Sequence, residues 1–270
     1  MSSLREIVMA NNYIEKKLRA PVSYYGGKGY LCRYILQMSP PHTTYVESFA
    51  GGLNVLLNKF KSDVEVVCDV NPELINFYHV LVDIPELVIE RVRQIPFGRA
   101  TFESAKMAGN RGDELTRAVN FLIRHHMSYS GIGKTWAEDT RKGRTWGGLP
   151  YDLNLVARRL QGVKIFLRSA FDVIPEYDSP ETWYYLDPTY YESTRVSSQM
   201  YDYEMNSFDH FRLLRLVRGL EGKVILSGYP HLRYDKELVG WDRVEKRFAA
   251  FSGLRKGDKT EKIEVFWVKS

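Results

Sequence analysis

The stretch Trp183-Tyr-Tyr-Leu-Asp-Pro-Thr-Tyr-Tyr191 predicts a buried strand that ends abruptly. Residues 182–186 are β-branched, aromatic or aliphatic, a composition that favours a strand covered on both faces. Asp187-Pro188 ends the strand, because proline cannot donate to a ladder and restricts the residue before it. A carboxylate and a rigid carbonyl are therefore expected at the carboxyl end of a strand, the edge where ligands bind in open α/β sheets.

These side chains suit a reaction at the exocyclic amine of a purine. Such an amine is a poor nucleophile, because its lone pair is delocalised into the ring. Asp187 and the carbonyl of Pro188 could accept its two N–H bonds and so favour the tetrahedral, nucleophilic form. Tyr190 could stack on the face of the ring. On these residues alone, a strand-ending turn with buried tyrosines is an equal alternative.

Composition limits the classes of protein. The 270 residues can bury one large core with a smaller subdomain, and the net charge of +5 is consistent with a polyanionic partner. The two cysteines, far apart, support neither a disulfide framework nor a zinc site, and the adjacent His125-His126 would diverge on a helix, so no metal is expected. The charged first twenty residues and the lack of a long apolar run predict a cytoplasmic protein without a membrane span.

Two glycine-rich loops indicate close approach to a ligand. Gly26, Gly27 and Gly29 surround Lys28 and lead into a helix-like segment, 30–38, although a surface turn with a solvated lysine is the simpler interpretation.

The second glycine-rich loop follows a predicted strand, 43–47, and Ser48–Leu57 reads as a tight turn into a helix. After the next strand, 64–68, Asp69 stands about 20 positions beyond the turn, where it could bond ribose hydroxyls or act as a simple turn residue.

Residues 86–160 interrupt the βα rhythm. Helical patterns at 86–94, 102–108 and 113–127 precede a glycine-rich segment, 128–150, that reads as irregular. Its basic residues alternate with aromatic ones, which suits a nucleic-acid surface, and a solvated flexible loop is nearly as plausible. The residues concerned are Arg124, Lys134, Arg141, Lys142, Arg144, Tyr129, Trp136 and Trp146.

The βα alternation then resumes and predicts an α/β fold whose parallel strands bring the ligand-binding loops to one edge of a sheet. A polar segment, 191–206, with Arg195 reads as a lid, and a basic connection, 251–259, carries Arg255 and Lys256. The predicted elements are a helix at 153–160, a strand at 163–167 with its exit at 170–172, a helix at 207–218 capped by Ser207, a strand at 223–226, a helix at 231–239, and strands at 243–248 and 262–268.

The chain as a whole resembles the Dam-like, or D12 class, adenine-N6 DNA methyltransferases of the alpha group. The resemblance covers residues 21–269 and implies a Rossmann-like methyltransferase sheet with helices on both faces. It also implies a catalytic domain of residues 1–85 and 161–270, interrupted by a mainly helical target-recognition insert at 86–160. The segments that carry it are Tyr25–Lys28, Val46–Gly52, Asp69–Asn71, Phe121–Gly131, Leu186–Tyr191, Leu226–Gly228 and Glu264–Trp267.

By this resemblance the cofactor is S-adenosyl-L-methionine, and Asp187, Pro188 and Tyr190 are catalytic. Thr189 departs from the second proline that is usual in the family. The implied cofactor-binding residues are Tyr25, Gly27, Lys28, Ser48, Phe49, Ala50, Gly51, Gly52, Asp69, and Phe171 or Asp172. The DNA-binding residues expected from the basic and aromatic segments are Arg124, Tyr129, Lys134, Arg141, Lys142, Arg144, Trp146, Arg195, Arg255 and Lys256.

The expected activity is direct in-line transfer of a methyl group from the cofactor to N6 of a flipped-out adenine in double-stranded DNA. We expect a monomer or weak dimer, and a restriction-endonuclease partner stays open. The alternatives are an RNA or other N-methyltransferase on the same core, or a catalytically silent nucleic-acid-binding homologue. A nicotinamide enzyme ranks last, because Phe-Ala-Gly-Gly lacks the G-x-G-x-x-G spacing.

Overall fold

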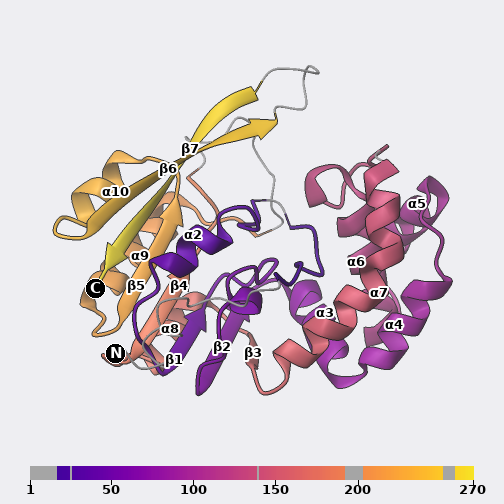
Figure 1. The fold of residues 1–270 in the computed structure, drawn as a ribbon, viewed down its shortest axis with the longest axis horizontal. Coiled ribbons are helices and arrows are strands. Elements are labelled where there is room, and N and C mark those ends of the chain that lie inside the picture. The colour runs from indigo at the N-terminus through magenta and orange to yellow at the C-terminus, as the bar shows by residue number, and fades with distance from the viewer. Residues whose placement is uncertain (1–16, 25, 139, 192–202, 252–258) are drawn as a thin grey trace, which may run out of the picture.

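The computed structural model describes residues 17–270 except 25, 139, 192–202 and 252–258 (Figure 1). Its centre is a seven-stranded sheet in the order β3-β2-β1-β4-β5-β7-β6, in which the first five strands are parallel. The strands are β1 (Thr44–Glu47), β2 (Val64–Asp69), β3 (Lys164–Leu167), β4 (Thr182–Leu186), β5 (Lys223–Gly228), β6 (Asp242–Phe251) and β7 (Lys259–Lys269).

The last two strands depart from the parallel order of the other five. β7 runs antiparallel to β5, and β6 antiparallel to β7. The chain joins β6 to β7 directly, and strands joined by a short connection pair antiparallel, whereas a parallel pair needs a crossover of a dozen or more residues.

Strand β4 lies in the middle of the sheet, between β1 and β5, and all five of its residues are buried. Trp183 and Tyr185 contribute to the hydrophobic cluster on one face of the sheet. Tyr184 and Leu186 contribute to the cluster on the other face. This alternation follows from the two-residue period of a strand, and it explains why the segment reads as continuously hydrophobic.

Helices cover both faces of the sheet. The cluster that contains Trp183 also receives side chains from α2 (Cys32–Gln37), the 3₁₀ helix η1 (Leu56–Asn58) and α3 (Pro72–Asp83). The opposite cluster receives them from α8 (Ala170–Glu176), α9 (Ser207–Gly219) and α10 (Leu232–Glu237). The molecule therefore has the helix–sheet–helix layers of a Rossmann-like methyltransferase fold, as the sequence predicted.

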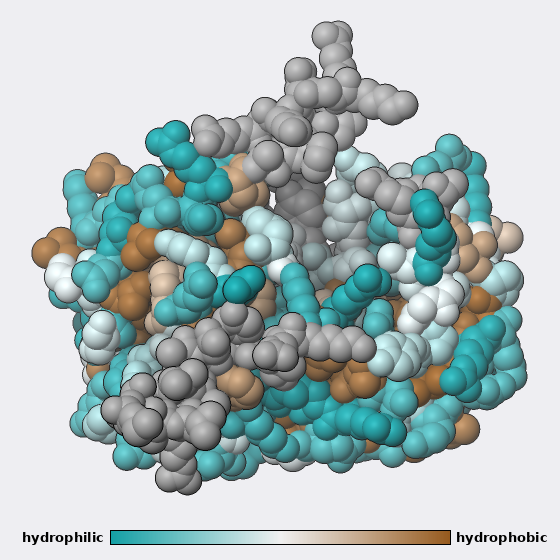
Figure 2. Space-filling view, viewed as in Figure 1, coloured by the Kyte–Doolittle hydropathy of each residue, from teal (hydrophilic) through white to brown (hydrophobic). Residues whose placement is uncertain are grey.

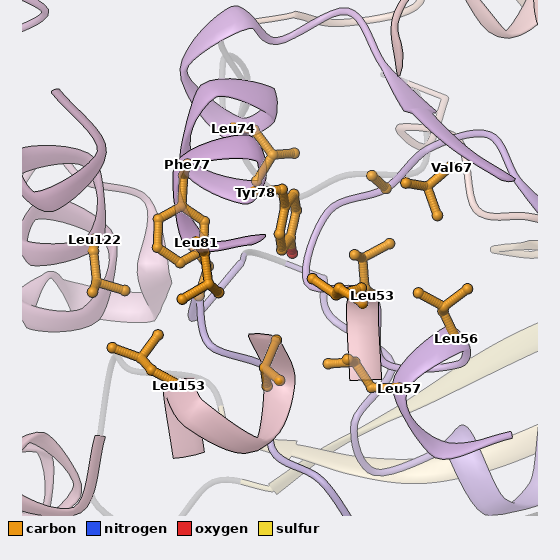
Figure 3. Close-up of a cluster of buried hydrophobic side chains, with 14 of the residues drawn as sticks. Leu53, Leu56, Leu57, Val67, Leu74, Phe77, Tyr78, Leu81, Leu122 and Leu153 are labelled. Carbon is orange, nitrogen blue, oxygen red and sulfur yellow. The ribbon is translucent and has the colours of Figure 1, made fainter. Parts of the chain in front are cut away.

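The segment between β2 and β3 continues past α3 into a helical subdomain beside the sheet, on the right in Figure 1. Its apolar residues join those of α3 in one cluster, in which Phe77 and Leu81 of α3 lie near Leu122 and Leu153 (Figure 3). The subdomain thus shares its core with the sheet domain. Its elements are α4 (Pro85–Gln94), α5 (Arg99–Ala108), α6 (Glu114–Met127), the 3₁₀ helix η2 (Tyr129–Gly131) and α7 (Thr140–Leu160).

Helix α7 corrects the prediction of an irregular segment over 128–150, because the chain is helical from Thr140 onward. Trp146, Leu149 and Leu153 recur at helical spacing and are all buried, so they form one apolar stripe. Glycines and Pro150, which disfavour a helix, stand within this segment. Tertiary burial of the stripe outweighs their low helix propensity.

Three smaller differences concern element ends. The turn after β1 leads only into the three-residue η1, and residues 170–172 are the first turn of α8 rather than the exit of a strand. Helix α9 is capped by Asn206 rather than Ser207, because the Asn206 side chain accepts from the backbone N–H of Phe208 and Asp209, and Asp209 bonds back. Within the described ranges, no helix combines the length and apolar character that crossing a membrane requires.

Candidate active site

The carboxyl ends of β1, β2 and β4 open on one cavity of about 390 Å³. Glu47 ends β1, Asp69 ends β2, and Asp187 follows β4 directly. Both glycine-rich loops reach the same cavity, whose lining extends from Tyr24 to Arg212, so segments far apart in the chain meet there. The predicted residues that line it are Gly27, Lys28, Phe49, Ala50, Gly51, Gly52, Asp69, Phe171, Asp187 and Pro188.

Bare backbone forms one wall of this cavity. Gly51 has φ +45°, in the left-handed region that favours glycine, and its carbonyl accepts a 2.7 Å hydrogen bond from the Tyr78 hydroxyl. A Cβ on Gly27 would lie 3.1 Å from the Tyr24 carbonyl oxygen and 3.3 Å from Nδ2 of Asn54. Asn54 therefore separates the two glycine-rich loops, and a side chain at Gly27 would push them apart.

Two acids, the buried Glu47 and the half-buried Asp69, stand at the carboxyl edge of the sheet. The carboxylate of Asp69 accepts a 2.9 Å bond from the backbone N–H of Asn71; burial raises its pKa, and the backbone donors oppose that shift. Glu47 accepts from the hydroxyl of Tyr45 at 2.7 Å and from the N–H of Leu56 at 3.0 Å. Burial raises the pKa of Glu47 to about 8, so its neutral form predominates at pH 7.

The carboxylate of Asp187 is bound by an ammonium. Nζ of Lys28 lies 2.7 Å from Oδ1 and 2.8 Å from Oδ2 of Asp187, and 3.5 Å from Oε1 of Glu264 on β7. Burial raises the pKa of Asp187 to about 6, against the opposing effect of the Lys28 charge and with a further upward contribution from Glu264. Burial would lower the pKa of Lys28, but the two carboxylates outweigh it and raise that pKa above its ordinary value.

Tyr190 is held beside this group rather than on the wall of the cavity. Its hydroxyl donates to Oε1 of Glu264 at 2.5 Å, and its ring lies 4.3 Å from that of Tyr229, centroid to centroid. The ammonium of Lys28 lies 4.9 Å from the centroid of the Tyr190 ring. In this state the cation covers the ring on which a base was expected to stack.

Not every predicted residue reaches the cavity. Ser48 is buried behind the turn, and Asp172 points away because successive side chains on α8 diverge by about 100°, so that only Phe171 faces inward. Tyr25 lies outside the described residues. Lys28 lines the cavity, but the structure engages its ammonium with Asp187 rather than leaving it directed at a cofactor.

Sequence reasoning missed several residues of the cavity wall. Glu47 carried a usable signal, since an acid directly before a glycine turn stands at the end of a strand. Arg212 carried none, because it lies within α9; its guanidinium is 4.2 Å from the centroid of the Phe171 ring. The remaining missed wall residues are Tyr24, Leu53, Asn54, Val55, Val70, Ser169, Ala170, Tyr185, Thr189, Tyr203, Glu204, Met205 and Asp209.

A second cavity, of about 360 Å³, lies between the sheet domain and the helical subdomain. Arg124 and Lys134, two of the predicted DNA-binding residues, line it together with His125 and Asn110. Arg124 donates to Oδ1 of Asn110 at 2.9 Å, and the His125 ring stacks on that of Tyr24 at 5.5 Å. Polar groups of the subdomain therefore come close to the first glycine-rich loop.

The other predicted DNA contacts divide into two groups. Tyr129, with 51% of its surface exposed, and Arg144 face the solvent. Lys142 and Trp146 do not: Lys142 donates to the carbonyls of His126 and Ser128 at the end of α6, and Trp146, only 5% exposed, donates to the Ile95 carbonyl. We therefore withdraw Lys142 and Trp146 as DNA contacts. Arg195, Arg255, Lys256 and the Arg141 side chain lie outside what the structure describes.

The surface is mostly polar, and the described residues form no metal site. On the face shown in Figure 2, hydrophilic residues predominate and hydrophobic ones lie in small, scattered groups. Among the residues that the structure describes, no three His, Cys, Asp or Glu side chains gather as a metal site would require.

A mainly parallel sheet with glycine turns and a carboxylate at the end of its central strand defines an α/β protein whose ligand site lies at the carboxyl ends of the parallel strands. The sequence model of the D12 class N6 adenine-specific DNA methyltransferases matches residues 24–235, and the chain belongs to this family. It is therefore an adenine-specific DNA methyltransferase, as the sequence predicted.

Two relatives illustrate the range of the family. The chain is 26% identical over 242 residues to the type II methyltransferase M.MjaIII of Methanocaldococcus jannaschii, across 80% of this chain and 83% of that protein. It is 30% identical over 124 residues to a DNA adenine methylase of Vibrio cholerae, across 43% of this chain and 44% of that protein.

Proposed function

We propose that the 390 Å³ cavity binds S-adenosyl-L-methionine and that Asp187, with the carbonyl of Pro188, binds the amino group of an adenine extruded from double-stranded DNA. The observation that carries this proposal is the opening of the Asp187 carboxylate into the same cavity as both glycine-rich loops and Asp69. Methyl transfer requires a donor and an acceptor in one enclosed space, and this cavity offers a wall for each.

The cavity fits the proposed cofactor in size and in chemistry. Its volume lies within the range of about 300–1,000 Å³ that is usual for small-molecule sites. The glycine wall admits a ligand against bare backbone, Asp69 offers a carboxylate to ribose hydroxyls, and Phe171 offers a ring to adenine. When bound, S-adenosyl-L-methionine supplies a methyl group on a positively charged sulfur, which is a good leaving group.

Asp187 acts on the amine of the substrate. As an acceptor of an N6–H bond, its carboxylate favours the tetrahedral amine and stabilises the positive charge that develops as N6 attacks. The ionised form does this work, so the reaction needs a pH above the Asp187 pKa of about 6. The Pro188 carbonyl accepts the second N–H. Binding both groups in one geometry supplies much of the acceleration.

DNA recognition is assigned to the helical insert, residues 86–160. Support comes from the exposed Tyr129 and Arg144 and from the second cavity, where Arg124 and Lys134 offer cations to phosphates. The insert adjoins the reaction cavity through the contact of Tyr24 with His125, so DNA held there would have its adenine close to Asp187. The protein is also proposed to be cytoplasmic and to act as a monomer or weak dimer.

Expression in a host without DNA methylation tests the activity and the site together. Sequencing of the genomic DNA for N6-methyladenine should reveal modification within one short sequence. Asp187→Asn should abolish it, while Asp242→Asn, the same change at an exposed position outside the cavity, should leave it intact. Modification by the Asp187→Asn variant would refute the assigned roles, and modification of RNA in place of duplex DNA would refute the substrate.

A further inference from the structure

One ion cluster couples three distant parts of the chain. Lys28 comes from the first glycine-rich loop, Asp187 from the end of β4 and Glu264 from β7. The side chains of Lys28 and Glu264 are 3% and 1% exposed, whereas that of Asp187 is 19% exposed. The cluster therefore holds one buried cation between two carboxylates, only one of which opens appreciably to the cavity.

The ammonium of Lys28 stands where the amine of a target base would have to be. It bonds both oxygens of Asp187, at 2.7 and 2.8 Å, and lies over the ring of Tyr190. An adenine that stacks on Tyr190 and donates N6–H to Asp187 needs the same space and the same acceptor. The ammonium and the base therefore exclude each other.

We propose that Lys28 is a place-holder for the target amine and that Glu264 is a positioning residue, which receives the ammonium when adenine enters. The proposal rests on the roles assigned above to Asp187 and Tyr190. In the DNA-free enzyme Lys28 keeps the acceptor bonded and the ring of Tyr190 covered. On base capture its ammonium moves from Asp187 toward Glu264.

Glu264 is suited to this exchange. Its Oε1 is 3.5 Å from Nζ of Lys28, so a short movement brings the ammonium into hydrogen-bonding range. Because a buried carboxylate needs a counter-charge, the pair with Lys28 offsets the loss of the bond to Asp187. Hydroxyls of Ser227 and Tyr190, at 2.7 and 2.5 Å, hold Oε1 in place, so the stacking ring stays fixed while the ammonium moves.

Two variants of the full-length protein should change base capture in opposite directions. Glu264→Gln keeps an acceptor for both hydroxyls but removes the charge that receives Lys28, so base capture should weaken at least about tenfold, the factor for one charge-assisted hydrogen bond. Lys28→Met combined with Glu264→Gln removes one charge of each sign and the competitor with it, so base capture should strengthen by a similar factor relative to Glu264→Gln.

The readout is fluorescence of a duplex with 2-aminopurine beside the adenine found by genomic sequencing, so that the target base keeps its N6 amine, titrated at pH 8 with each enzyme. The same factors should appear in KM for unmethylated chromosomal DNA. Calorimetry with S-adenosyl-L-methionine should give one affinity for all variants, and thermal melts check folding. If the double variant does not fold, Lys28→Met alone replaces it with the same expectation, because methionine offers Asp187 no competing N–H donor.

Equal base capture by the two variants, or stronger base capture by Glu264→Gln, would overturn the proposal. So would loss of cofactor affinity in the double variant with base capture unchanged, because Lys28 would then be a cofactor contact. Failure of the Asp187 assignment is distinguishable, since it appears as methylation by Asp187→Asn and does not depend on the fluorescence titration.

Discussion

Lowering the pH should switch off methyl transfer through one carboxyl group. The pKa of Asp187 lies at about 6 instead of its ordinary 3.8, because burial and Glu264 outweigh the opposing charge of Lys28. Only the ionised group has the negative charge that stabilises the cation developing at N6, so kcat/KM should fall about tenfold for each pH unit below 6. At pH 5 an Asp187 with a pKa of about 6 leaves roughly a tenth of the plateau activity, whereas an unshifted group would leave about nine-tenths.

The assay is kcat/KM for tritiated methyl transfer to unmethylated chromosomal DNA between pH 5 and 9, because this quantity reports the groups of the free enzyme. Circular dichroism across the range excludes unfolding as the cause. Glu264→Gln should move the acid limb of the profile to lower pH, since the Glu264 charge raises the pKa of Asp187. A profile that stays flat from pH 7 to 5, or an acid limb that Glu264→Gln moves to higher pH, would refute the reasoning.

Three further outcomes follow from individual contacts. Thr189→Val removes the hydroxyl that accepts a 2.9 Å backbone bond from the cavity wall at 203–205, so calorimetry should show several-fold weaker cofactor binding, which Thr189→Ser restores. Glu47→Gln should flatten the dependence of the free energy of unfolding on pH. The Glu47 carboxyl has a pKa of about 8 in the folded protein and 4.5 in the unfolded chain, so between these values the folded state keeps a proton that the unfolded state loses. The wild-type free energy of unfolding, measured with urea, should therefore fall by a few kcal/mol as the pH rises from 4.5 to 8, about 1.4 kcal/mol per pH unit. Lys134→Ala with Arg144→Ala should lower the slope of log K against log salt by about 2, whereas Lys142→Ala, which loses a contact to α6, should lower the melting temperature without changing that slope.

The layers of the fold could be predicted because the signals for them are local. Continuous burial of Thr182–Leu186, the stop at Pro188 and the two glycine-rich loops are patterns within ten residues of sequence. Helix α7 could not be predicted in the same way, since glycines and Pro150 stand within it. What stabilises it is burial of Trp146 against Ile95, a contact across 51 positions that no local pattern contains.

The same distinction divides the candidate site. Asp187 and Asp69 were identified because each follows a strand, and parallel strands bring their carboxyl ends to one edge. Which groups pair across that edge was not predictable. A lysine within a glycine-rich loop is a plausible anion ligand whichever anion it meets, and the sequence could not reveal that the anion is a carboxylate 159 positions away.

Glu264 illustrates how a residue that the sequence did not assign to the site contributes to it. On β7 it lies among Val265, Phe266 and Trp267 and reads as one polar position in a hydrophobic strand. The antiparallel insertion of β7 next to β5 places Ser227 opposite Phe266 and brings the Glu264 carboxylate within 2.7 Å of the Ser227 hydroxyl. Because that carboxylate also binds Tyr190 and faces Lys28, the strand that departs from the parallel order sets the charge and the aromatic wall around Asp187.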